Sequence, residues 1–134
     1  MIKDVNLEEV WRIRQQVMYP HESIDFVRLD DDEIGTHLGL YENDQLVSVI
    51  TLFEKETSLQ FRKFATVITE QGKGYGTVLL QYVMDWAEEN KMKTIWCNAR
   101  LSATRLYEKF GMQQVGNSWE KYGIEFIKME KQLK

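Results

Sequence analysis

Apolar residues recur at three- and four-residue spacing in two long segments of the chain, which predicts two amphipathic helices. In the first segment, residues 7–19, one helical face carries Leu7, Val10, Trp11, Arg14 and Val17. Asn6 followed by Glu9 is similar to a capping box and predicts where this helix begins. Pro20 disfavours helical backbone before it, so the helix is expected to end near Tyr19.

The second helical segment spans residues 75–90, and Asn90 is a plausible stop. Its predicted apolar face consists of Val78, Leu79, Tyr82, Val83 and Trp86. Tyr82 and Trp86 are expected to lie in the core. A shorter helix is predicted over residues 101–110, closed by Gly111, and one helical turn around residues 24–27 of an otherwise irregular, acidic stretch.

Short runs rich in β-branched and aromatic residues predict the strands. These runs cover residues 2–5, 36–41, 46–53, 58–67, 94–98, 112–115 and 124–129. Strands that meander first and a strand–helix–strand crossover later imply a mixed, mostly antiparallel sheet. We therefore expect an α/β protein of the α+β type, with six to seven strands and helices on both faces. Residues 1–134 are expected to form a single domain.

Composition narrows the function classes. The net charge is −4, which argues against a nucleic-acid or anionic-membrane partner, since either favours a concentrated basic face. Cys97 is the only cysteine, so no internal disulfide can form, which fits a reducing compartment. The start of the chain does not read as a signal peptide, and no apolar run is long enough to span a membrane. These features predict a cytoplasmic protein.

The segment Gln71-Gly72-Lys73-Gly74-Tyr75-Gly76 joins a predicted strand to the second helix. Its alternating glycines would let a phosphate lie directly against backbone N–H groups, and the helix start adds further N–H groups. A Rossmann fingerprint would need glycine at Thr77, and a P-loop would need Lys73 elsewhere. The remaining readings are another kind of pyrophosphate site or an ordinary glycine-rich turn without a ligand.

Two further segments give the glycine-rich segment a context. It matches the pattern Gln/Arg-x-x-Gly-x-Gly/Ala of the GCN5-related N-acetyltransferase (GNAT) family. Phe64-Ala65-Thr66 precedes it at the position of the strand that pairs with pantetheine in that family, and residues 103–112, Ala-Thr-Arg-Leu-Tyr-Glu-Lys-Phe-Gly-Met, resemble the family's second motif. The chain therefore resembles a GNAT protein most clearly over residues 59–112.

This resemblance implies an acetyl-CoA-dependent N-acetyltransferase with no metal. The cofactor-binding residues that it implies are Phe64, Ala65, Thr66, Gln71, Gly72, Lys73, Gly74, Tyr75, Gly76 and Thr77. The amides of the glycine-rich segment would hold the pyrophosphate, and residues 64–66 would pair with pantetheine through their main chain. The Lys73 side chain could reach a phosphate or remain a solvated loop lysine.

Tyr107 occupies the position where the family carries its general acid, which protonates the departing thiolate. A phenol with an ordinary pKa near 10 suits that role, although packing at the helix–sheet boundary is the alternative. No general base is assigned. Glu54, Glu56 and His37 are candidates, each expected to be an exposed residue instead, and Gln60 stands near the position where some relatives carry a Glu. Whether Arg100 or Asn98 touches the cofactor stays open.

The acceptor is the least defined part. The resemblance implies a primary amine on a small molecule or a peptide, attacked directly in a ternary complex. Candidate cleft residues are Trp11, Arg14, Tyr19, His21, Phe26, Trp119 and Tyr122. The acidic run 30–33 could attract a cationic amine or be an ordinary solvated loop.

The alternative function is a non-catalytic acyl-CoA-binding or interaction domain. Edge-strand pairing could give a homodimer.

Overall fold

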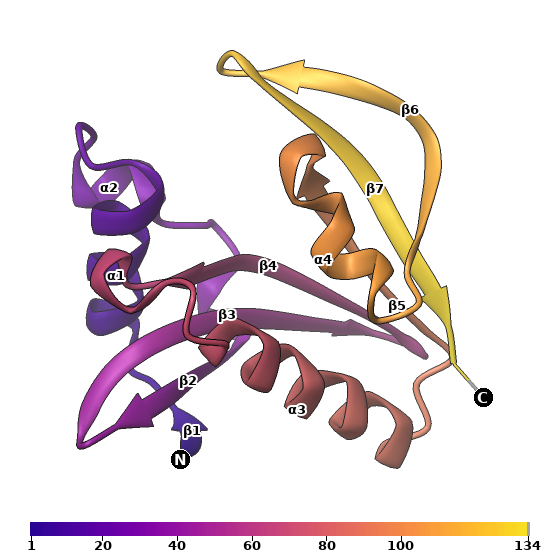
Figure 1. Cartoon of the computed structure of the whole chain (residues 1–134), viewed down its shortest axis with the longest axis horizontal. Coiled ribbons are helices and arrows are strands. Elements are labelled where there is room, and N and C mark those ends of the chain that lie inside the picture. The colour runs from indigo at the N-terminus through magenta and orange to yellow at the C-terminus, as the bar shows by residue number, and fades with distance from the viewer. Residues whose placement is uncertain (134) are drawn as a thin grey trace. The chain divides into compact units, whose positions relative to one another are not determined.

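The computed structural model describes residues 1–133 and contains a seven-stranded sheet in the order β1-β2-β3-β4-β5-β7-β6 (Figure 1). Its longer elements are β1 (Ile2–Asp4), α1 (Leu7–Met18), α2 (Ile24–Val27), β2 (Thr36–Glu42), β3 (Gln45–Lys55), β4 (Ser58–Thr66), α3 (Tyr75–Glu89), β5 (Thr94–Arg100), α4 (Thr104–Glu108), β6 (Gln113–Lys121) and β7 (Ile124–Gln132). Three short 3-10 helices are η1 (Asp32–Ile34), η2 (Ile68–Glu70) and η3 (Leu101–Ala103). The predicted mixed sheet is confirmed.

The chain divides into two compact units, which are described separately. The first comprises Met1–Phe53 and Arg62–Val83, and the second comprises Glu54–Phe61 and Met84–Lys134. The prediction that residues 1–134 form one domain stays a prediction.

In the first unit, β1, β2 and β3 form antiparallel pairs. Asn43 and Asp44 join β2 to β3 with φ angles of 52° and 64°, the backbone of a two-residue hairpin turn with both central residues left-handed. The α1 helix begins as predicted, because the Asn6 side chain accepts a hydrogen bond from the Glu9 N–H at 2.9 Å.

The buried face of α1 differs in one respect from the expected one. Ile13, which the predicted face omits, packs in a cluster with Val49 and Ala65. This cluster links α1 to β3 and to the end of β4, so the helix is fixed against the strand that leads into the glycine-rich segment.

The predicted buried face of α3 is wrong by about one residue. Leu79, Leu80 and Val83 are buried, whereas Val78 is 52% exposed and Tyr82, expected in the core, is 42% exposed. Residues 78–80 are three consecutive apolar residues, so periodicity alone does not decide which of them face inward. The hydroxyl of Tyr82 favours the more exposed position.

In the second unit, β5 runs parallel to the first part of β4, with Ser58 opposite Thr94 and Gln60 opposite Trp96. β7 pairs antiparallel with both β5 and β6. The predicted helix over 101–110 is η3 followed by α4, and Gly111 follows with a φ of 88°. Within residues 1–133, no helix is long and apolar enough to cross a membrane.

Candidate functional site

The predicted phosphate-binding segment, residues 71–77, is called the glycine loop below. It follows η2 and leads into α3, which begins at Tyr75. Gly72 and Gly74 have φ angles of 81° and 87°, in the left-handed region that side chains with a Cβ avoid. No atom lies within 4 Å of the position that a Cβ would take at either residue. The backbone conformation, rather than close packing, therefore requires these two glycines.

Gly76 is required for a different reason. A Cβ at this position would lie 3.2 Å from Cζ of Phe64 and 3.4 Å from Oγ1 of Thr66. The first turn of α3 thus lies directly against the end of β4. Gln71 adds a second link between the two segments, because its side-chain amide donates a hydrogen bond to the Thr66 carbonyl at 3.0 Å.

The N–H groups of the glycine loop are free of backbone partners from Gly72 onward. In the part of the chain that the structure describes, the first N–H after this point with a backbone acceptor is that of Val78, which donates to the Gly74 carbonyl at 3.1 Å. Unpaired N–H groups at a helix start, together with the positive end of the helix dipole, favour an anion. The loop has the chemistry of a phosphate site.

Lys73 is an exposed loop lysine in this structure, in keeping with one of its two expected arrangements. Its ammonium group pairs with the carboxylate of Glu70 at 2.6 Å on an exposed surface. The hydrogen bond and the charge of Glu70 raise the pKa of the Lys73 ammonium. The side chain stays cationic, but in this structure its charge is balanced by a neighbour.

The end of β4 has an irregular backbone, and its last residues do not pair with β5. Lys63 has a φ of 54°, a left-handed conformation inside a strand. The Ala65 carbonyl accepts a hydrogen bond from the Ser48 hydroxyl at 3.1 Å. The register with β5 covers only Ser58 to Gln60, so residues 64–66 lie outside that pairing. An extended ligand could add there as a strand.

Tyr107 lies on α4 in the second unit and is 8% exposed. Its ring is 5.6 Å from that of Phe61, at an interplanar angle of 48°. Burial raises the pKa of the phenol well above 10, Cys97 raises it further, and Arg100 lowers it in part. The hydroxyl therefore keeps its proton at any physiological pH. The ring also packs against Phe61, as the alternative of a packing residue expects.

A buried ion pair dominates the polar interior of the first unit, and the sequence did not predict it. Arg14 is fully buried and holds Asp32 with two hydrogen bonds, Nη1 to Oδ2 at 2.8 Å and Nη2 to Oδ1 at 3.0 Å. Nη1 also donates to the Val27 carbonyl and Nη2 to the Thr51 hydroxyl. Burial acts to raise the pKa of Asp32, but the hydrogen bonds from Arg14, the Leu29 N–H and Trp11 outweigh it and lower the pKa overall.

Three expectations are corrected by this network. Asp32 lies within the acidic run 30–33, yet it is 3% exposed and is not part of a solvated loop. His37, expected to be exposed, is buried, with Nδ1 2.9 Å from the Thr51 hydroxyl and Nε2 2.8 Å from the Asp32 carbonyl oxygen. Both ring nitrogens are occupied, so His37 is no longer a candidate general base. Arg14 is equally unable to line a cleft.

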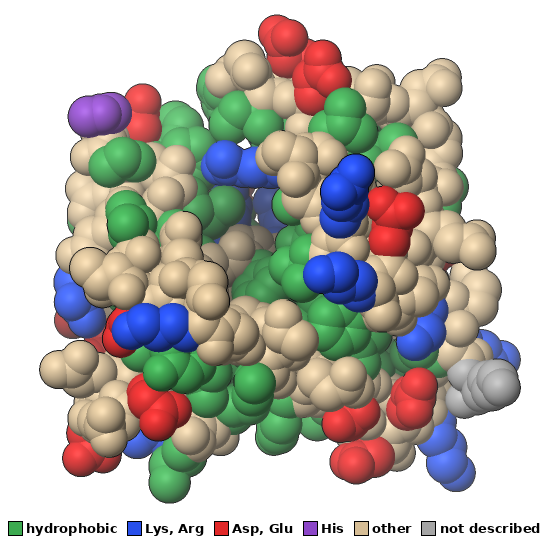
Figure 2. All heavy atoms as spheres, in the orientation of Figure 1, with side chains coloured by type: hydrophobic (Ala, Val, Ile, Leu, Met, Phe, Trp, Pro, Cys, Tyr) green, Lys and Arg blue, Asp and Glu red, His purple; other side chains and the backbone are tan. Residues whose placement is uncertain are grey.

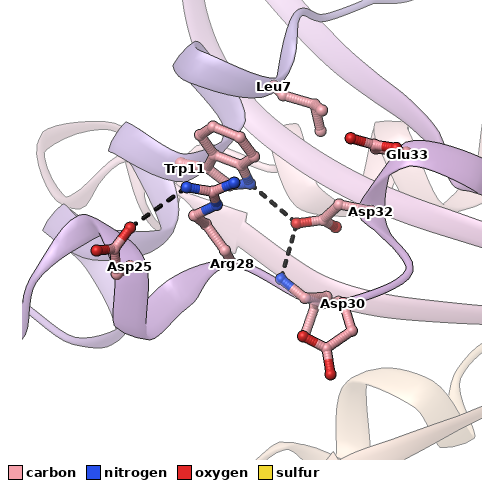
Figure 3. A pocket seen from close by; sticks show the side chains of 8 residues that line it. Leu7, Trp11, Asp25, Arg28, Asp30, Asp32 and Glu33 are labelled. Carbon is pink, nitrogen blue, oxygen red and sulfur yellow. Dashed lines mark hydrogen bonds and ion pairs between the residues drawn. The ribbon is translucent and has the colours of Figure 1, made fainter.

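A cavity of about 380 Å³ lies beside this ion pair and is called the α1–α2 pocket below. It is lined by Leu7, Trp11, Asp25, Arg28, Leu29, Asp30, Asp32 and Glu33 (Figure 3). Of the residues expected in an acceptor cleft, only Trp11 lines it. Figure 2 shows basic side chains on one face of the molecule separated by acidic, apolar and polar ones, in keeping with the low net charge.

The predicted site residues fall into two groups. Residues 64–66 and the glycine loop lie together in the first unit, where Gln71 and Gly76 hold the loop against β4. Tyr107 belongs to the second unit. Sequence reasoning missed the buried pairing of Arg14 with Asp32 and the irregular backbone at Lys63. The only signal for the ion pair was a cationic residue on an otherwise apolar helical face.

Comparison with known proteins identifies the family of the chain. Residues 3–133 match the acetyltransferase (GNAT) domain family. An uncharacterised N-acetyltransferase, YitI, of Bacillus subtilis is 26% identical over 132 residues, covering 92% of this chain and 89% of that protein. The [ribosomal protein bS18]-alanine N-acetyltransferase of Haemophilus influenzae is 29% identical over 119 residues, covering 85% and 80%.

A solved structure shares the fold. The ribosomal-protein-S18-alanine N-acetyltransferase of Escherichia coli superimposes with a TM-score of 0.84 at 18% sequence identity, covering 99% of this chain and 93% of that one. The family match spans almost the whole chain and includes both the glycine loop and the segment of Tyr107. The chain therefore belongs to the GNAT family of acetyl-CoA-dependent N-acetyltransferases.

Proposed function

We propose that this enzyme transfers the acetyl group of acetyl-CoA to a primary amine of a small molecule or peptide, by direct attack of the amine in a ternary complex. The observation that carries the proposal is the backbone of the glycine loop. Two left-handed glycines and a run of N–H groups without backbone partners precede the start of a long helix. This arrangement suits a pyrophosphate.

Donor binding would use the main chain almost throughout. The N–H groups from Gly72 to Thr77 would surround the pyrophosphate, and Phe64, Ala65 and Thr66 would pair with the amide groups of pantetheine. The hydrogen bond from Gln71 to the Thr66 carbonyl ties these two regions together. The Lys73 side chain could contribute a charge only by leaving Glu70.

The proposed acyl transfer uses one side chain, that of Tyr107, and a backbone N–H group. The amine nitrogen forms a bond to the thioester carbonyl carbon, and the oxygen becomes an oxyanion that a backbone N–H of β4 would stabilise. When the oxyanion collapses, the carbon–sulfur bond breaks and the sulfur leaves with the electron pair. Tyr107 would then give its proton to the thiolate, and the proton that the nitrogen loses as the amide forms would return to the phenolate through solvent. The raised pKa of the phenol ensures that this proton is present.

The general base stays unassigned in this proposal. Glu54 and Glu56 are exposed, as expected, and the nitrogens of His37 are occupied by Thr51 and Asp32. Solvent would accept the proton that the attacking ammonium must lose.

The test is release of CoA thiol from acetyl-CoA across a panel of amines, amino acids, polyamines, aminoglycosides and peptides. The proposal predicts amine-dependent release that is saturable in both substrates, with an acetylated product of the expected mass. If acetyl-CoA binds but no amine in the panel increases thiol release, the proposed acceptor class is wrong. The bS18-alanine N-acetyltransferase relative makes a peptide beginning with alanine one useful member of the panel.

A further inference from the structure

The α1–α2 pocket has one wall that is held rigidly. The Trp11 indole N–H donates to Oδ2 of Asp32 at 2.9 Å, and the Leu29 N–H donates to the same oxygen at 2.9 Å. Asp32 is in turn fixed by Arg14, whose side chain is fully buried. The indole ring is therefore presented to the pocket in a fixed orientation, with its N–H directed at the buried carboxylate (Figure 3).

A cation from the chain itself already lies on this wall, and it is held loosely. The Arg28 guanidinium lies over the Trp11 ring, 4.5 Å from the ring centroid, and pairs with Asp25 at 3.3 Å (Figure 3). The side chains of Arg28 and Asp25 are 52% and 87% exposed. Exposed ion pairs contribute little to stability, so Arg28 can leave the ring at small cost.

The charge around the pocket favours a further cation. The charge of Asp32 is balanced by Arg14 and that of Asp25 by Arg28. Two other lining residues, Asp30 and Glu33, make no ion pair within the described part of the chain. A pocket with uncompensated carboxylates attracts cations, and the face of an indole ring binds them directly.

We propose that the α1–α2 pocket is a cation site, occupied by Arg28 in the free protein, that takes a second ammonium or guanidinium group of the acceptor amine. Trp11 would be the specificity-determining residue, with Asp30 and Glu33 adding attraction, and Asp32 would position the indole. The selection of acceptors rests on the proposed function. The cation site itself does not, because it can be tested by binding alone.

The binding test uses three small amines that differ only at one end: 1,4-diaminobutane, butylamine and 4-aminobutanoate. Each is titrated into the full-length protein while the indole N–H signals of its four tryptophans are followed by NMR. The diamine and butylamine should both shift the Trp11 signal and saturate, because each carries an ammonium group, and the anion-bearing amine should bind most weakly because the pocket carboxylates repel it. Binding of 4-aminobutanoate as tight as that of the two other amines, or no saturable shift of the Trp11 signal with any of them, would overturn the proposal.

Removing the internal occupant gives a sharper test. Arg28→Gln should raise the affinity for the diamine by about threefold or more, because the ligand no longer competes with the guanidinium for the ring. Arg12→Gln is the matched control, since Arg12 is an exposed residue of α1 that does not line the pocket. The two variants carry the same charge change. If they alter the diamine affinity equally, Arg28 is not an occupant of the site and the inference is wrong.

Turnover separates this inference from the proposed function. In the wild type, kcat/KM for the diamine should exceed that for butylamine, and Asp30→Asn with Glu33→Gln should remove most of the difference. Turnover of both amines without a diamine preference supports the proposed function and contradicts the inference. A Trp11 shift with no turnover of any amine supports the cation site and contradicts the proposed function.

Discussion

The glycine loop and the α1–α2 pocket lie in the same compact unit, yet they offer a ligand different chemistry. The loop offers backbone N–H groups, freed by left-handed glycines, and depends on side chains only for its attachment to β4. The pocket offers an indole ring and carboxylates set by a buried ion pair. Recognition of a ligand by main-chain N–H groups needs only a short pattern of glycines, which can be seen in the sequence. Side-chain recognition depends on residues that only the fold brings together.

The largest effect is expected where the pocket is anchored. Asp32→Ala leaves the fully buried guanidinium of Arg14 without its carboxylate, which should lower the free energy of unfolding by about 3–5 kcal/mol. Urea denaturation measures this change. Asp31→Ala is the control, because Asp31 is exposed and its pair with Arg62 is 3.9 Å long, so its loss should cost less than about 1 kcal/mol. Similar losses in the two variants would show that the ion pair does not anchor the unit.

The lowered pKa of Asp32 adds a pH dependence to that anchor. In the unfolded chain the carboxyl group has a pKa of about 3.9, and in the folded protein its pKa is lower. The stability that it contributes is therefore fully present above about pH 4 and is lost as the pH falls through the folded-state value. Wild type should show this acid destabilisation and Asp32→Ala should not, when urea midpoints are compared at several acidic pH values.

The next effect concerns chemistry rather than binding. Tyr107→Phe removes the proton that the thiolate needs, and should reduce kcat by about 100-fold while leaving acetyl-CoA affinity unchanged. Tyr82→Phe is the matched control, since it makes the same chemical change at a side chain that is 42% exposed. Steady-state kinetics and calorimetry with acetyl-CoA measure both quantities. An unchanged kcat in Tyr107→Phe would leave Tyr107 as a packing residue beside Phe61.

A smaller effect is expected in the glycine loop. Gly74→Val forces a β-branched residue into a φ of 87°, a strain of about 1–3 kcal/mol that the loop can relieve by changing its backbone. Acetyl-CoA affinity should fall by about tenfold, and diamine binding at Trp11 should be unaffected. Gly116→Val is the control, because Gly116 has a φ of 76° and an equally open surrounding but lies in β6. Calorimetry that finds equal affinities in both variants would contradict a role for the loop in donor binding.

The smallest effect is expected at Cys97, whose thiol could otherwise be confused with the CoA thiol in the release assay. Burial raises the pKa of the Cys97 thiol to about 12, so only about one molecule in 10,000 carries the thiolate at pH 8. A thiol-specific dye should not react with the folded protein on the time scale of turnover, and should react with one thiol per chain in urea. Rapid reaction of the folded protein would mean that thiol release cannot be attributed to CoA alone.

How far sequence could predict this molecule depends on the range of the interactions involved. The cap at Asn6 and the alternating glycines of the glycine loop are local patterns, and the sequence shows both of them. The pairing of Arg14 with Asp32 joins residues 18 positions apart on different elements. Nothing in the run of acidic residues distinguishes Asp32, the buried one, from its exposed neighbours.

The buried face of α3 shows a second limit. Leu79 and Leu80 are buried and Val78 is not, although the three adjoining residues have similar hydrophobicity. The choice depends on how the helix rotates against the sheet, and close contact of Gly76 with Phe64 helps to set that rotation. The fold class could therefore be predicted from the sequence, while the α1–α2 pocket required the structure.

One titration tests the central claim, that main-chain groups of the glycine loop hold the donor, most directly. CoA is added to isotopically labelled protein and the backbone amide signals are followed by NMR. The account predicts that the amides from Gly72 to Thr77 shift and saturate with a single affinity, and that Gly74→Val weakens this response. Saturable binding of CoA that leaves those six amides unmoved would contradict it.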